Sequence, residues 1–150
     1  MQKKTTIIPI NRIFQRLVQE HPVATNQIRS PRDGADIVKE LISDADREHF
    51  VVLSLNNKHE VTSIEIAHTG SLNTCIVHPR EVFKNALLSN AAAIFIAHNH
   101  PSHHLSPSDE DITMTQRLVK VGEILGIEVL DHVIVNSKNE YYSMKSFEDI

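Results

Sequence analysis

Residues 91–111 contain, in this order, a strand-length apolar run, a proline and a helix-opening serine. The apolar run at 91–97 predicts a strand. Residues two apart in a strand project from the same face, so a strand that continues through His100 directs His98 and His100 to one point. Pro101 cannot donate to a sheet ladder and ends the strand. The chain is therefore expected to bring two imidazoles together at the end of a strand.

A third metal ligand follows within the same segment. Ser108 and Asp111 have the spacing of a capping box, which places Asp111 in the first turn of a helix. Alone, Asp111 is explained by the helix dipole, and a single histidine is more often a surface or core residue than a ligand. The conjunction of His98, His100 and Asp111 instead indicates a metal site. Zinc held by three protein ligands keeps a position for water, whose pKa falls to about 7, so the pattern favours catalysis.

The spacing of these residues resembles a known family. His98-x-His100-Pro101, six residues, Ser108, two residues and Asp111 resemble the full JAMM (MPN+) metalloprotease signature. Asn99 with His100-Pro101-Ser102 resembles its bacterial RadC branch, as do the segments 77–83, 111–113 and 126–134. The resemblance covers about residue 30 to the C-terminus.

The resemblance implies a JAB/MPN fold akin to cytidine deaminases and a zinc-dependent metallopeptidase or isopeptidase. One Zn²⁺ per chain would be held by His98, His100 and Asp111, and the substrate would be a peptide or isopeptide of unknown identity. The branch is conventionally labelled DNA repair. Manganese, iron or nickel would also suit these ligands, so the metal is not fixed by them.

Two further residues are predicted to be catalytic. The family takes a general base from a glutamate just before an early strand, and Glu48 has that position; the alternative is a solvated acid beside Asp44, Asp46 and Arg47. The serine matching Ser108 donates to the oxyanion in the family, whereas a plain helix cap is the alternative. We favour the catalytic role for both residues.

Three other histidines are weaker candidates for metal ligands. The branch usually has glycine and a polar residue where this chain has His103 and His104, which are expected to be solvent-facing loop residues because the ligand set is complete without them. His132 lies in an apolar stretch, and a buried role behind the ligands is favoured over ligation.

The composition fits one modest domain of 150 residues. Cys75 is the only cysteine, so neither an intramolecular disulfide nor a cysteine-rich zinc site is expected. No apolar run reaches the ~18 residues of a membrane span, and we expect a cytoplasmic protein without membrane contact. The net charge of −4 gives no general attraction to nucleic acid, although a local basic patch would permit binding. The sequence leaves the oligomeric state open.

The remaining pattern predicts an α/β/α sandwich with a mixed sheet, because helical patterns alternate with strands and one strand pair forms a hairpin. The elements expected are helices near 10–18, from Pro31, from Pro79 and from Ser108 to Gly126, and strands at 49–55, 61–67, 91–100 and 127–135, with Tyr141-Tyr142 pairing back. In the helix from Pro79, Leu87 is expected to face inward, and the spacing of Leu118, Val121 and Leu125 marks the helix after Ser108.

Two parts are expected along the chain. Residues 1–29 form an N-terminal helix and connector, and 30–150 form the catalytic domain. The first 29 residues are too short for the helix-hairpin-helix region that full-length RadC relatives carry, so this chain is expected to be the catalytic domain alone.

Two alternatives remain open on the residues themselves. A His₂Asp site with a general base would also serve a metal-dependent nuclease or phosphoesterase. A non-catalytic, DNA-repair-associated binding module is the other alternative, although relatives of that kind lose the ligands that this chain retains.

Overall fold

The computed structural model describes residues 25–70 and 77–150. The helix predicted near residues 10–18 lies outside them. The elements in chain order are α1 (Pro31–Ile42), β1 (His49–Leu55), β2 (Val61–Thr69), α2 (Pro79–Leu88), β3 (Ala93–Asn99), α3 (Asp109–Leu125), β4 (Glu128–Val135) and β5 (Tyr141–Ser143).

The five strands form one mixed sheet in the order β2-β1-β3-β4-β5. β1 pairs antiparallel with both β2 and β3, β3 pairs parallel with β4, and β5 returns antiparallel to β4. The parallel pair needs a long connection, which α3 supplies. The predicted mixed sheet is confirmed.

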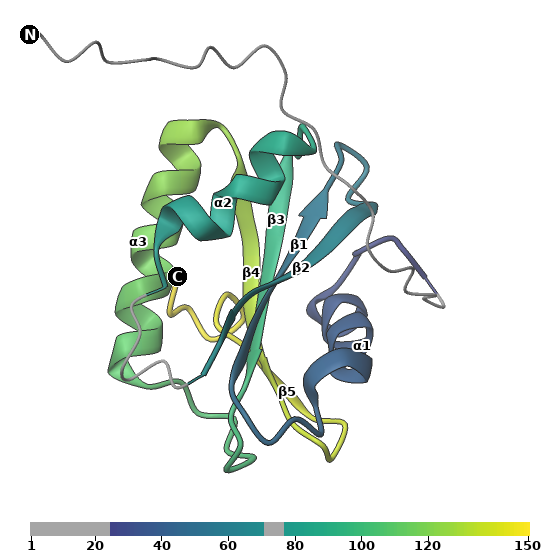
Figure 1. Cartoon of the computed structure of the whole chain (residues 1–150), viewed down its shortest axis with the longest axis vertical. Helices are drawn as coiled ribbons and strands as arrows, with labels where there is room; N and C mark the ends of the chain where they lie inside the picture. The colour runs from purple at the N-terminus through teal and green to yellow at the C-terminus, as the bar shows by residue number, and fades with distance from the viewer. Residues whose placement is uncertain (1–24, 71–76) are drawn as a thin grey trace, which may run out of the picture.

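Helices cover both faces of this sheet (Figure 1), with α1 on one side and α2 and α3 on the other. Each side has its own apolar core: Val38, Leu53 and Phe95 belong to the core under α1, and Phe50 and Leu118 to the core under α2 and α3. The central strands β1 and β3 are buried along almost their whole length, as expected for strands covered on both faces. The predicted α/β/α sandwich is confirmed.

Local sequence explains how α1 seats on the sheet. Asp33 Oδ2 accepts hydrogen bonds from the backbone N–H groups of Arg29 and Ser30, which satisfies donors at the helix start. Gly34 faces Phe95 so closely that a Cβ at position 34 would lie 2.3 Å from the ring. Glycine is needed here because the helix backbone contacts a strand residue directly.

Two details differ from the sequence predictions. β3 ends at Asn99, one residue earlier than expected. Leu87 is 53% exposed, so its predicted burial is wrong, and Leu125, one of the residues that marked the helix after Ser108, is 41% exposed. α2 packs on β1 and β2 at the edge of the sheet, which makes its buried stripe narrower than the apolar pattern suggests, and Leu125 lies in the last turn of α3, just before its Gly126 cap.

Candidate metal centre

Four side chains from three separate elements meet at one end of the sheet. His98 lies near the end of β3 and His100 just beyond it, Asp111 is in the first turn of α3, and Glu48 directly precedes β1. In the antiparallel register Phe50 faces His98, so Glu48, two residues earlier, is brought beside His100, two residues later. The structure thus unites the three predicted ligands with the predicted base.

The ligand atoms of these four residues all lie within 4.8 Å of one another. The two imidazole Nε2 atoms of His98 and His100 are 2.9 Å apart. Asp111 places Oδ1 3.6 Å from His98 Nε2 and Oδ2 3.4 Å from His100 Nε2, and Glu48 Oε1 is 3.8 Å from His100 Nε2. His98 and Asp111 are buried, whereas His100 and Glu48 keep 16% and 13% of their side chains exposed. One side of the cluster is therefore open to solvent.

A chain of buried hydrogen bonds sets the tautomer of His98. The Thr115 hydroxyl donates its only proton to the Asp111 carbonyl, so the ring N–H of His132 Nδ1 must donate to Thr115 Oγ1. Burial lowers the pKa of His132 well below its usual value, which leaves Nε2 of the neutral ring as an acceptor. His98 Nδ1, 2.7 Å away, then donates to it, and the lone pair of His98 is on Nε2, facing Asp111 and His100.

His100 is fixed in the same tautomer by the backbone. Its Nδ1 lies 2.8 Å from the His104 carbonyl oxygen, which only accepts, so Nδ1 carries a hydrogen and Nε2 the lone pair of the neutral ring. The two Nε2 atoms are 2.9 Å apart and their lone pairs would repel each other, so a proton or a metal cation between them stabilises this arrangement. The hydrogen bond with Asp111 raises the pKa of His100, in keeping with the demand for positive charge at this point.

Asp111 serves the helix and the cluster at once. Its Oδ2 accepts a hydrogen bond from the Ser108 backbone N–H at 2.8 Å, as the third helical residue of a capping box. Burial raises the pKa of Asp111, but interactions with the His100 and His98 rings in their protonated forms outweigh it and hold the pKa far below its usual range. The carboxylate is therefore ionised and available as a ligand.

These donors fit a zinc ion. Bonds of about 2.0–2.1 Å in a tetrahedral site put neighbouring donor atoms about 3.3 Å apart, and the separations among His98, His100 and Asp111 bracket that value. Two imidazole nitrogens and one carboxylate whose ligand atoms converge are the donor chemistry that zinc takes in open sites.

Ser108 caps α3. Its Oγ accepts the Asp111 backbone N–H at 3.1 Å, which is the cap alternative considered from the sequence. That bond uses a lone pair of the oxygen and leaves the hydroxyl proton for another acceptor. Capping and donation to a substrate oxygen are thus compatible roles.

The loop histidines lie outside the cluster. His103 and His104 are exposed, and the His103 ring contacts the Ser137 hydroxyl, with Nδ1 3.2 Å from Oγ. His104 supports the cluster through its backbone carbonyl, the acceptor for His100, and not through its imidazole. Sequence reasoning placed His132 behind the ligands but missed Thr115. The one signal that could have identified Thr115 is its position four residues, or about one helical turn, after Asp111.

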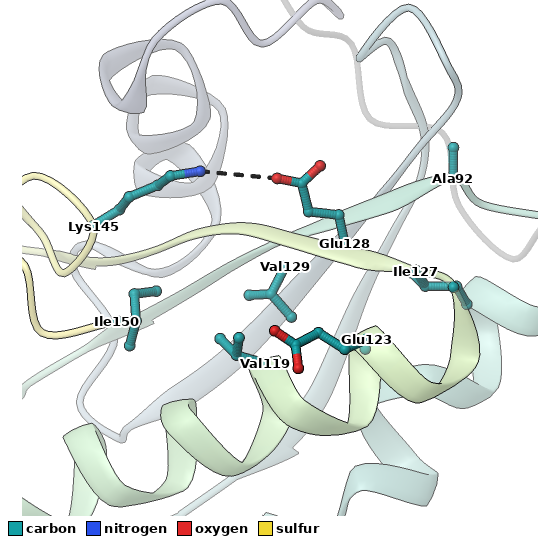
Figure 2. A pocket seen from close by; sticks show the side chains of 10 residues that line it. Ala92, Val119, Glu123, Ile127, Glu128, Val129, Lys145 and Ile150 are labelled. Atoms are coloured by element: carbon teal, nitrogen blue, oxygen red, sulfur yellow. Dashed lines mark ion pairs between the residues drawn. The ribbon is translucent and has the colours of Figure 1, made fainter.

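A cavity of about 550 Å³ lies far from this cluster. It is lined by Val119 and Glu123 from α3 and by Glu128 and Val129 from β4. Figure 2 shows Lys145 and Glu128, which also line it, as an ion pair with 3.9 Å between Nζ and Oε1. The lining uses the C-terminal half of α3, whereas the cluster lies at the start of this helix of about 25 Å. The cavity is separate from the candidate metal centre.

The fold and the cluster define an α/β/α protein whose sheet and helix termini build a candidate metal centre. A family model described as a RadC-like JAB domain matches residues 28–149, and the chain belongs to this family. The family predicted from the motif spacing is thereby confirmed.

Curated relatives are 45% to 53% identical to this chain over the residues that match. A UPF0758 protein of Desulfitobacterium hafniense (strain DSM 10664 / DCB-2) is 50% identical over 131 residues, which are 87% of this chain and 57% of the relative. A UPF0758 protein of Alkaliphilus metalliredigens is 45% identical over 143 residues, 95% of this chain and 61% of the relative. One of Moorella thermoacetica is 53% identical over 108 residues, 72% and 47%. The chain spans about half of these relatives' length, and their names state no activity.

No helix within the described ranges is long and apolar enough to cross a bilayer.

Proposed function

We propose that this chain is a zinc-dependent hydrolase that cleaves an amide bond in a peptide or isopeptide. The observation that supports this most strongly is the pair of imidazole Nε2 atoms 2.9 Å apart, flanked by the buried carboxylate of Asp111 and by the partly exposed carboxylate of Glu48. His98, His100 and Asp111 hold the ion. When bound, Zn²⁺ supplies Lewis acidity and lowers the pKa of water at the site.

Glu48 has the position of a general base. Its carboxylate is 13% exposed and lies beside the open side of the cluster, 3.8 Å from His100 Nε2. In the proposed reaction a Glu48 oxygen accepts a proton from water and returns it to the leaving nitrogen. Ser108 Oγ, held at the start of α3, donates a hydrogen bond to the substrate oxygen on which negative charge develops.

The test combines metal analysis with parallel assays. Zinc-loaded wild-type protein is expected to retain about one Zn²⁺ per chain and to hydrolyse an isopeptide or peptide panel, because the site offers one set of three ligands. Glu48→Gln should keep the metal and lose about 10²- to 10⁴-fold in kcat, the usual contribution of a general base. Asp111→Asn, the matched control, should lose metal and turnover together.

Other outcomes would support the alternatives. Cleavage of nucleic acid or of a phosphodiester in the same panel, with peptides untouched, would replace the amide hydrolase by a phosphoesterase. A protein that binds zinc and turns over nothing would be a binding module. Absence of bound metal after zinc loading would contradict the hydrolase proposal altogether.

A further inference from the structure

We propose that Asn99, the residue between the two histidine ligands, is a positioning residue that holds Glu48 at the metal centre. The inference rests on the proposed function and extends it to a residue without contact to the ion. Asn99 is the last residue of β3 and is only 1% exposed. Side chains alternate along a strand, so Asn99 points away from the face that carries His98 and His100.

The Asn99 amide bonds the backbone on both sides of Glu48. Its Oδ1 accepts the His49 backbone N–H at 2.8 Å, and its Nδ2 donates to the Arg47 carbonyl oxygen at 2.9 Å. The His49 N–H belongs to the peptide group after Glu48, and the Arg47 carbonyl to the peptide group before it. Because both planar groups are tied to one rigid amide, the φ and ψ angles of Glu48 are constrained between them.

The side chain acts where strand pairing stops. The paired residues of β1 and β3 begin with Phe50 opposite His98, so Glu48 lies beyond the ladder. On its other side the Glu48 carbonyl accepts the Gly70 N–H at 2.8 Å, from the end of β2. Asn99 thus fixes the backbone around Glu48, two residues before the first pair between β1 and β3.

Asparagine suits this task for a chemical reason. A backbone N–H only donates and a carbonyl only accepts, so the clamp needs one acceptor and one donor on a single short side chain. Aspartate offers acceptors alone, and an apolar residue offers neither. In the segment 98–100, His98 and His100 are the proposed ligands. Asn99, which points the other way, holds the backbone of Glu48, the proposed base.

The consequence is a defect confined to the proton-transfer step. Without the clamp Glu48 is still present but its carboxylate is no longer held in place, and misplacement by about 1 Å can cost on the order of 10²-fold in rate. His98, His100 and Asp111 keep their own supports, so zinc affinity should change little.

The experiment is a double-mutant cycle on the zinc-loaded full chain with a fluorogenic lysine-linked isopeptide. Asn99→Ala should lower kcat about 10- to 100-fold, with KM and zinc affinity, measured by competition with a chromogenic chelator, within about 3-fold of wild type. In the Glu48→Gln background the same change should cost less than about 3-fold, because Asn99 acts through Glu48. An additive loss, or an unchanged kcat in the single variant, overturns the inference.

A second measurement does not depend on turnover. Hydrogen exchange of the His49 amide should be at least about 10-fold faster in Asn99→Ala, since its buried acceptor is gone. If wild type cleaves no substrate, the proposed function fails, and this exchange rate alone decides the clamp: an unchanged rate refutes it. Asn99→Ser, which keeps a shorter donor and acceptor, replaces Asn99→Ala if the latter does not fold.

Asn56→Ala is the matched control. Asn56 Oδ1 accepts the Lys58 and Glu60 backbone N–H groups in the turn at the opposite end of β1. The control loses a comparable backbone clamp and should leave kcat and His49 exchange unchanged. A similar kcat loss in both variants would indicate general destabilisation and would also overturn the inference.

Discussion

The tautomer of His98, a proposed ligand, depends on Thr115, which lies outside the four-residue cluster. Thr115 accepts from His132 Nδ1 at 2.6 Å, and His132 in turn accepts from His98 Nδ1 at 2.7 Å. Each bond in this buried series fixes which nitrogen of the next ring carries hydrogen. Because metal ligands bind through a lone pair, the series stabilises the one tautomer of His98 that can bind zinc through Nε2.

Thr115→Val is therefore expected to weaken zinc binding about 10- to 100-fold while preserving side-chain shape, as changes behind a ligand commonly do. The measurement is chelator competition, joined to ¹⁵N shifts of the imidazoles, which report the tautomers. Thr113→Val on the exposed side of the same helix is the control and should bind zinc like wild type. Equal affinity in the two variants would show that the tautomer of His98 needs no help from Thr115.

At the scale of elements, the start of α3 joins helix capping to the cluster. Ser108 and Asp111 exchange hydrogen bonds between side chain and backbone, which was predictable because the capping box is a local pattern of four residues. The Thr115–His132–His98 series was not predictable in the same way. It depends on the parallel register that sets Ile96 beside His132, and these two residues are separated in the sequence by the whole of α3.

Ser108→Ala separates the two roles of the serine. Loss of the cap should cost about 1 kcal/mol of unfolding free energy. If the hydroxyl also donates to the substrate oxygen, kcat should fall about 10²- to 10³-fold as well. Ser30→Ala is the control for an N-cap position away from the cluster, since Ser30 precedes α1, which lies on the opposite face of the sheet from α3 (Figure 1). Urea titration and steady-state kinetics measure both effects, and a Ser108→Ala protein with wild-type kcat would leave the serine as a cap alone.

At the scale of the whole molecule, the sandwich, its mixed sheet and the bounds of β1 were predictable from apolar periodicity and turn residues. The exposed Leu87 was not, because its environment depends on how far α2 extends over the sheet edge. Glu48 came from family resemblance, since 50 residues of chain separate it from His98 and only the β1–β3 register joins them. Residues that act through long-range register, Asn99 and Thr115 among them, are those that local patterns leave out.

An ion bound at the candidate metal centre would also stabilise the fold. Its three proposed ligands come from the end of β3 and from the first turn of α3, so an ion bound there links two elements that separate when the protein unfolds. A ligand that binds only the native state adds about 2.7 kcal/mol to the unfolding free energy at 100 times its Kd. For a domain of this size that corresponds to a rise in Tm of about 5 to 10 °C.

Zinc is accordingly expected to raise the Tm of wild type and of Glu48→Gln alike, because Glu48 is not one of the three proposed ligands, and a chelator should reverse the rise. Asp111→Asn should show no comparable shift when compared with and without zinc, whatever its own Tm. Calorimetric scans of the three proteins provide the measurement. A zinc-induced rise of equal size in Asp111→Asn would mean that the ion binds elsewhere on the chain, and would remove the carboxylate from the proposed ligand set.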